Sequence, residues 1–111
     1  QGTGAESRDF VHVADIAGAI GCIAEQAQFG GEAYNVASGS EVTVEQLARL
    51  LCDALGLPRR FAFDGKVPGG NPLRWRAELG RIRALGFEPS VSIEHGVAGY
   101  ASWVRRELQH A

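Results

Sequence analysis

The chain has 111 residues, of which 45% are hydrophobic and 22% are charged, as is ordinary for a single globular domain. Its formal net charge of -2 gives no basic field that would gather nucleic acid. No apolar stretch approaches the roughly 20 residues that a membrane-spanning helix needs. The composition therefore argues against a nucleic-acid partner and a membrane span within these residues, and we expect a cytoplasmic protein.

The first forty residues predict a strand, a helix and a second strand. Residues 9–13 alternate and are rich in aromatic and β-branched side chains, which favours a short strand. Asp15 is placed to cap a helix that runs to about Gln28. Residues 33–37 are apolar and brief enough for a buried strand. The apolar face of the helix is expected to consist of Ile16, Ile20, Ile23 and Ala27.

The remaining residues predict three helices, a third strand and one long loop. Thr43 and Gln46 form a capping box at the start of a helix that Gly56 ends. Residues 60–63 predict a strand, and residues 64–72, with three glycines and two prolines, predict a surface loop. A short helix precedes Gly86, and Ser92 caps the last helix.

The resulting order, β-α-β-α-β-α-α, predicts an α/β fold with short, partly parallel strands. Three short strands make a poor sheet by themselves, because parallel strands need helices on both faces and several neighbours. We therefore expect residues 1–111 to form a single domain that docks onto another part of an enzyme.

One glycine pattern invites a dinucleotide-binding interpretation. Gly18, Gly21 and Ala24 satisfy Gly-x-x-Gly-x-x-Ala and follow a predicted strand. Glycines that cradle a pyrophosphate must lie in the turn before the helix, whereas Gly18 is predicted to lie one turn inside it. We assign this chain no cofactor-binding residue and no metal ligand.

Several segments together resemble one known family. They are Arg8-Asp-Phe-Val-His-Val-x-Asp-Ile-Ala17, Tyr34-Asn-Val-Ala-Ser-Gly39, Pro68-Gly-Gly-Asn-Pro72, Leu85-Gly-Phe-x-Pro89 and Ser92-Ile-Glu-x-Gly-Val97. In order and spacing they resemble the C-terminal, substrate-binding part of the extended short-chain dehydrogenase/reductases, the NAD-dependent epimerase/dehydratase family. The chain begins at Gln1 and contains no methionine, so we expect a piece of a longer polypeptide whose N-terminal Rossmann part is absent.

The resemblance implies a parent enzyme, an isomerase or lyase, that uses NAD or NADP and acts on a nucleotide-diphosphate sugar. Whether the parent enzyme forms a homodimer stays open. The family's catalytic pair is a tyrosine followed four residues later by a lysine. Lys66 is the only lysine, and it follows neither Tyr34 nor Tyr100 at that spacing. We therefore expect no catalytic residue and no bound cofactor in this chain alone.

Arg8 is the first candidate ligand residue. Its planar fork suits a phosphate, although an adjacent Arg-Asp pair can equally be a surface ion pair. The resemblance implies that Arg8 grips the diphosphate and that Phe10 lies near the nucleotide. In a regular strand Phe10 and His12 would share the face of Arg8, with Val13 packed on the opposite side, and His12 is expected to have a hydrogen-bonded structural role.

The second group of candidates follows the glycine-rich loop. The resemblance implies that Arg74 is a second phosphate-binding arginine, that Glu78 stands where members carry an aspartate at the ribose, and that Val44 contacts the base. Arg74 and Glu78 could instead form an i,i+4 ion pair. Trp75 is expected to cover the core. Asn35 is expected to tie down a neighbouring loop.

A second hypothesis is a free-standing, non-catalytic module that binds a nucleotide or a protein and derives from the same fold. The base, the sugar and the reaction type stay open at this point.

Overall fold

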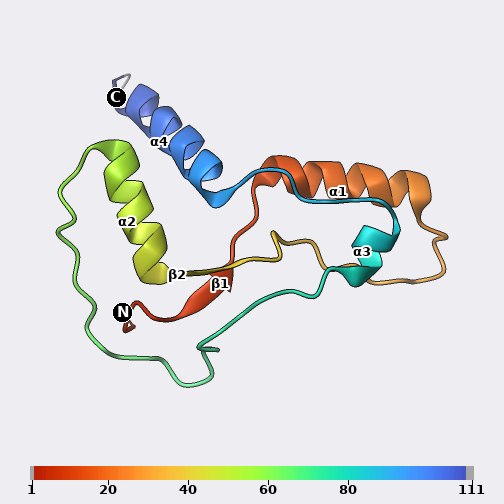
Figure 1. The fold of residues 1–111 in the computed structure, drawn as a ribbon, viewed down its shortest axis with the longest axis horizontal. Coiled ribbons are helices and arrows are strands. Elements are labelled where there is room, and N and C mark those ends of the chain that lie inside the picture. Colours follow the sequence, from red (N-terminus) through yellow and green to blue (C-terminus); the bar gives the residue numbers. More distant parts are fainter. Residues whose placement is uncertain (1, 110–111) are drawn as a thin grey trace.

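The computed structural model describes residues 2–109 as two short strands and four helices joined by long loops (Figure 1). In chain order the elements are β1 (Ser7–Asp9), α1 (Val13–Gln26), β2 (Glu41–Thr43), α2 (Val44–Leu55), α3 (Gly80–Ala84) and α4 (Ile93–Gln109). The observed order is β-α-β-α-α-α. Of the three predicted strands only the first has a counterpart within residues 2–109, and β2 lies where no strand was predicted.

The sheet is a two-stranded antiparallel ribbon, so the prediction of partly parallel strands is wrong for these residues. β1 pairs with β2 so that Ser7 faces Thr43 and Asp9 faces Glu41. The strand predicted over 9–13 ends at Asp9, and residues 33–37 and 60–63 form no strand. A strand forms only when a neighbouring segment pairs its backbone N–H and C=O groups with it. No segment within residues 2–109 does so for either stretch.

Helix α1 begins three residues earlier than expected. His12 is its N-cap, and the His12 Nδ1 accepts a hydrogen bond of 3.1 Å from the Ala14 N–H. The prediction of Asp15 as the cap is wrong, because the Asp15 carboxylate is buried and accepts hydrogen bonds from Ser90 and Val91. The structural role expected for His12 is confirmed by its cap.

The buried face of α1 also differs from the predicted one. Asp15 and Ala19 are the buried residues of the helix. Of the predicted face, Ile23 is half-buried and packs against the core, whereas Ile20 is 61% exposed. Val13, which was expected to pack inward, is 71% exposed. Val13, Ile16 and Ile20 therefore form an apolar stripe that is exposed to solvent. Exposure of large apolar side chains to water is unfavourable in free energy.

Helices α2 and α4 begin as predicted, because their caps are local. The Thr43 hydroxyl accepts from the Gln46 N–H, and the Gln46 side chain accepts from the Thr43 N–H. Gly56 follows α2 in the left-handed conformation, with φ of 70°. Ser92 accepts a hydrogen bond from the His95 N–H at the start of α4.

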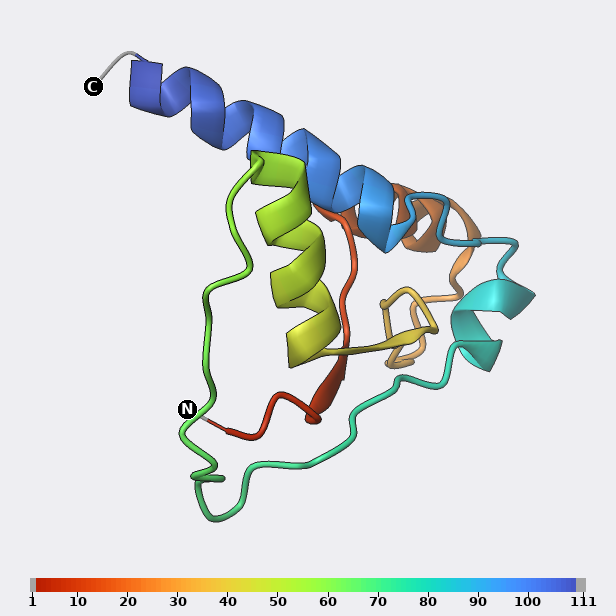
Figure 2. The same ribbon diagram turned by 60° about the vertical axis from the view of Figure 1, so that its left-hand side comes forward.

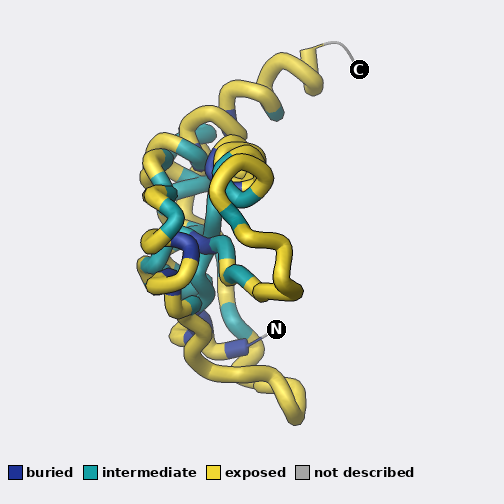
Figure 3. Tube along the Cα trace, turned by 90° about the vertical axis from the view of Figure 1, so that its right-hand side faces the viewer, coloured by how far each residue is buried: buried dark blue, intermediate teal, exposed yellow. Residues whose placement is uncertain are grey.

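The apolar core is small for a chain of this length. Ala19, Ala37, Leu79 and Ile82 form one buried cluster beneath α1 and α3, and α4 buries Val97 and Ala101. The radius of gyration is 16.8 Å, against about 13 Å for a compact domain of this size. Helices α2 and α4 lie against each other (Figure 2), and α1 extends away from this pair (Figure 1). Buried segments are sparse along the trace (Figure 3).

Carboxylates hold the loops that this core does not reach. Asp9 accepts hydrogen bonds from the backbone N–H groups of Ser38, Gly39 and Ala77, which joins β1 to two distant loops. Glu6 accepts from the N–H groups of Thr3 and Gly4, and these bonds hold the pKa of Glu6 below its ordinary value. These polar junctions fix the loops on either side of β1.

Candidate functional site

Arg8 is held in place at the edge of β1. Its Nη1 donates to the carbonyls of Ser7 and Pro72, at 2.7 and 2.9 Å, and its Nη2 donates to the Asn71 side chain at 2.7 Å. Its guanidinium also lies 6.0 Å from the ring centre of Trp75. A guanidinium has five N–H groups, so with three of them engaged two remain free of partners among residues 2–109. The alternative interpretation, a surface ion pair between Arg8 and Asp9, is not what the structure shows.

Two depressions adjoin Arg8. The smaller, of about 140 Å³, is lined by Arg8 together with Gly2, Glu6, Val44, Pro68 and Asn71. The larger, of about 340 Å³, is lined by Arg8 together with Asp9, Asn35, Val36, Ala37, Trp75 and Ala77. The structure therefore brings two of the expected ligand residues, Arg8 and Val44, to one small depression.

Trp75 borders the larger depression and does not cover the core. Its side chain belongs to the exposed apolar residues, with 59% of its surface accessible, so the prediction of core packing is wrong. The segment that contains it runs as an extended loop beside β1, where the Leu73 carbonyl accepts from the Ser7 N–H. Alternation along this extended segment turns Trp75 outward toward Arg8.

Asn35 borders the same depression and fixes its floor. Its side-chain amide donates to the Glu78 carbonyl at 3.1 Å, which confirms that Asn35 ties down a neighbouring loop. The Glu78 carboxylate accepts from the Gly80 N–H at the start of α3. Glu78 lines neither depression beside Arg8, and it makes no ion pair with Arg74.

Arg74 is engaged by Glu41 of β2 at 2.7 Å. The hydrogen bond from Arg74 and a second one from the Ser7 hydroxyl lower the pKa of Glu41 to about 2. The Arg74 side chain is nevertheless 79% exposed, and its Nη1 has no partner among the described residues. Arg74 lines neither depression beside Arg8, so the structure does not bring the two arginines to one cavity.

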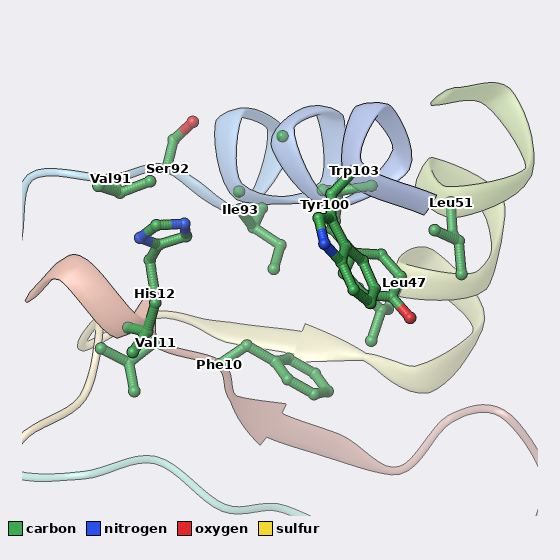
Figure 4. Close-up of a pocket in the computed structure, with 14 residues that line it drawn as sticks. Phe10, Val11, His12, Leu47, Leu51, Val91, Ser92, Ile93, Tyr100 and Trp103 are labelled. Atoms are coloured by element: carbon green, nitrogen blue, oxygen red, sulfur yellow. The ribbon is translucent and has the colours of Figure 1, made fainter. Parts of the chain in front are cut away.

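Phe10 lies in a different cavity from Arg8. It lines an apolar groove of about 590 Å³ between the end of β1, α2 and α4. Figure 4 shows the rings of Phe10, Tyr100 and Trp103 in this groove, with His12 at its other end. The strand ends at Asp9, so the face expected to continue from Arg8 to Phe10 and His12 does not persist.

Sequence reasoning missed Asn71 and Glu41. Each provides the side-chain acceptor for one of the candidate arginines, Arg8 or Arg74, from a distant part of the chain. Asn71 precedes Pro72 in the glycine-rich loop, a pattern that predicts a turn and does not predict its partner. No local sequence signal identifies Glu41, because its partner Arg74 belongs to a distant segment on the other side of β1.

The glycine pattern of α1 does not form a dinucleotide-binding turn. Gly18 and Gly21 lie inside α1, as predicted, where their N–H groups belong to the helix and face no phosphate. Among residues 2–109, no cluster of three or more His, Cys, Asp or Glu side chains has the arrangement of a metal site. None of the helices in this part of the chain is long and apolar enough to cross a membrane.

Known proteins resemble this chain in sequence and in fold. Residues 1–37 match the model of the NAD dependent epimerase/dehydratase family. The GDP-L-fucose synthase 1 of Arabidopsis thaliana is 34% identical over 108 residues, which cover 96% of this chain and 32% of that protein. Residues 1–37 thus carry the match to the NAD dependent epimerase/dehydratase family, and the similarity to GDP-L-fucose synthase extends over nearly the whole chain. The chain spans about a third of the length of the curated relatives it matches, such as 32% of this one.

Solved structures of this epimerase/dehydratase family contain the same fold segment. MoeE5 in complex with UDP-glucose and NAD matches with a TM-score of 0.86 and 29% identity, over 96% of this chain and 36% of that one. RMD from Pseudomonas aeruginosa, complexed with NADPH, matches with a TM-score of 0.83 and 28% identity, over 96% of this chain and 35% of that one. The similar proteins include a nucleotide-sugar reductase, the dTDP-4-dehydro-6-deoxy-D-allose reductase of Streptomyces bikiniensis, and a UDP-glucose 4-epimerase from Thermotoga maritima.

Proposed function

We propose that this chain is the nucleotide-sugar-binding part of an NAD(P)-dependent epimerase, dehydratase or reductase, and that it is not catalytic by itself. The observation that carries the proposal is the bonding of Arg8, which is fixed by three hydrogen bonds and keeps two N–H groups free. A fixed guanidinium with free donors suits a diphosphate, because it loses little freedom on binding. The names of the GDP-L-fucose synthases support a GDP-linked sugar.

The other candidate residues take supporting roles in this proposal. Val44 contacts the base from the small depression, while Arg74 offers its free Nη1 to a phosphate oxygen. Glu78 and Phe10 line neither depression beside Arg8, so a role for them requires contact with a part of the ligand beyond the diphosphate. Binding energy at the nucleotide would then orient the sugar, which raises the rate of a reaction at a distance from these residues.

We further propose that the NAD(P)-binding part of the enzyme covers the exposed apolar surfaces of this chain. The groove beside Phe10, Tyr100 and Trp103 and the stripe of Val13 and Ile20 would bury large apolar area against such a partner. The matched solved chains are about three times as long as this one, since it covers 35% or 36% of them. The NADPH and NAD in those complexes support NAD or NADP as the cofactor.

The proposal is tested by measuring the affinity of the intact protein for GDP, UDP and dTDP by calorimetry. Arg8→Ala should weaken binding of the preferred nucleotide about 10- to 100-fold, as expected for lost hydrogen bonds to a charged group. Arg60→Ala is the matched control, because Arg60 is exposed and its side chain has no partner among residues 2–109. Unchanged affinity in Arg8→Ala would remove the proposed diphosphate site.

The free-standing module is the alternative, and thermal melting followed by circular dichroism separates the two. A chain that needs a covering partner should melt over a broad range when isolated, because few of its contacts are buried. A sharp, cooperative transition of residues 1–111 would favour the independent module.

A further inference from the structure

Arg8 lines two depressions of unequal size, and this arrangement suggests an orientation for a bound nucleotide sugar. The smaller depression has a volume of about 140 Å³ and contains Val44, and the larger has about 340 Å³ and contains Trp75. In a nucleotide sugar the diphosphate is the middle of the molecule, with the nucleoside on one side and the sugar on the other. If the diphosphate binds Arg8, as proposed above, the two ends fall naturally into different depressions.

We propose that the larger depression is the subsite for the sugar, and that the indole of Trp75 packs against the sugar ring. This inference rests on the proposed binding of the diphosphate by Arg8. Trp75 is 59% exposed although an exposed indole is unfavourable in water, which is the expected state of an aromatic residue whose partner is a ligand. The flat indole matches the C–H face that a pyranose ring presents.

The rest of the lining offers both polar groups and apolar surface, as a sugar with hydroxyl groups and a C–H face requires. Both oxygens of Asp9 already accept hydrogen bonds, from Ser38, Gly39 and Ala77. The Asn35 amide already donates to the Glu78 carbonyl. Val36, Ala37 and Ala77 add apolar surface. A ligand group in this depression therefore meets polar and apolar surface in about equal measure, with Arg8 at its boundary.

The nucleoside end is assigned to the side of the smaller depression through Val44, the residue expected to contact the base. Val44 provides an apolar contact for a base, and Asn71 places a side-chain amide beside Arg8. The Glu6 carboxylate in the same depression is occupied by the N–H groups of Thr3 and Gly4. Assignment of the base to this side leaves Trp75 for the other end of the ligand.

The test labels the intact protein with 5-fluorotryptophan and follows it by fluorine NMR. The Trp75 resonance is the one that disappears in Trp75→Phe, and the Trp103 resonance, identified by Trp103→Phe, reports on the distant groove. GDP-L-fucose is compared with GDP as the probe without a sugar. We expect GDP-L-fucose to shift the Trp75 resonance and GDP to shift it far less, with Trp103 unmoved by both.

Affinities measured by calorimetry complete the test. Trp75→Ala should weaken GDP-L-fucose binding about five- to tenfold and change GDP binding less than about twofold, while Trp75→Phe should keep most of the affinity. Equal weakening for both probes, or no weakening for either, would overturn the sugar subsite. The proposed function fails separately, if Arg8→Ala leaves the affinity for GDP unchanged.

Discussion

The carboxylate of Glu41 holds the guanidinium of Arg74 through two hydrogen bonds, of 2.7 and 3.3 Å, although the residues lie 33 positions apart. Glu41 belongs to β2, and Arg74 belongs to the extended segment on the other side of β1. The Ser7 hydroxyl of β1 donates to the same carboxylate at 2.7 Å. One carboxylate thus joins three adjacent pieces of chain beside the candidate site.

This junction predicts a pH dependence of stability. The pKa of Glu41 falls from its ordinary 4.5 to about 2 on folding, first through the Arg74 hydrogen bond. A depressed pKa contributes stability that is present above pH 4.5 and is lost as the pH falls toward 2. Urea unfolding of Glu41→Gln should therefore show a smaller loss of stability across this pH interval than the unchanged protein.

The control for this comparison is Glu25→Gln. Glu25 is exposed on α1 and its carboxylate has no hydrogen-bond partner within the described range. The pH dependence should be unaffected by this change. Identical slopes for the unchanged protein and Glu41→Gln between pH 4.5 and 2 would contradict the role assigned to Glu41.

The hydrogen bonds of Asp9 predict that Asp9→Asn lowers the free energy of unfolding much more than Asp64→Asn does. The two oxygens of Asp9 face only donors, namely the N–H groups of Ser38, Gly39 and Ala77 and the Ser38 hydroxyl. An asparagine would turn an NH₂ group toward one of these donors, so Asp9→Asn should reduce the free energy of unfolding by about 1–3 kcal/mol. Urea denaturation measures this loss.

Asp64→Asn is the matched control for Asp9. Only the Oδ1 of Asp64 accepts hydrogen bonds, from the N–H groups of Gly2 and Lys66. An asparagine keeps that oxygen and points its NH₂ group elsewhere. Its unfolding midpoint should stay near that of the unchanged protein, and equal losses at both positions would refute the explanation for Asp9.

Local signals explain which parts of the fold the sequence predicts. Thr43 and Gln46 cap α2 from within three residues, and Ser92 caps α4 in the same way, so both helices begin where expected. Residues 33–37 and 60–63 have the composition of strands, yet a strand exists only through a partner that composition does not reveal. The face of α1 was mispredicted because Asp15 turns inward to bind Ser90.

The candidate site likewise contains residues that the sequence identifies and residues that it does not. Arg8 is recognisable because it lies in a segment typical of the family. Its acceptor Asn71 lies 63 positions away in an irregular loop, where neither periodicity nor spacing relates the two residues. Trp75 was expected in the core because tryptophan is usually covered, whereas the extended backbone around it turns the indole outward.

The histidine cap of α1 predicts a difference between two substitutions of His12. The His12 Nδ1 accepts from the Ala14 N–H, and an asparagine oxygen can take the same position. His12→Ala should reduce the free energy of unfolding by about 1 kcal/mol, and His12→Asn by about half as much or less. Urea unfolding compares the two variants. Equal losses would show that ring packing against Gly96, and not the cap, is what His12 contributes.

Two glycines predict opposite effects of the same substitution. Gly56 ends α2 with φ of 70°, and its N–H donates to the Asp53 carbonyl at 3.1 Å. An added Cβ is unfavourable in this left-handed conformation, so Gly56→Ala should destabilise the protein by about 1 kcal/mol. Gly21 lies inside α1 with no atom within 4 Å of an added Cβ. Gly21→Ala should therefore stabilise the helix by up to about 1 kcal/mol. Thermal melting of both variants measures the difference, and a shift of the same sign in both would show that backbone conformation does not govern these positions.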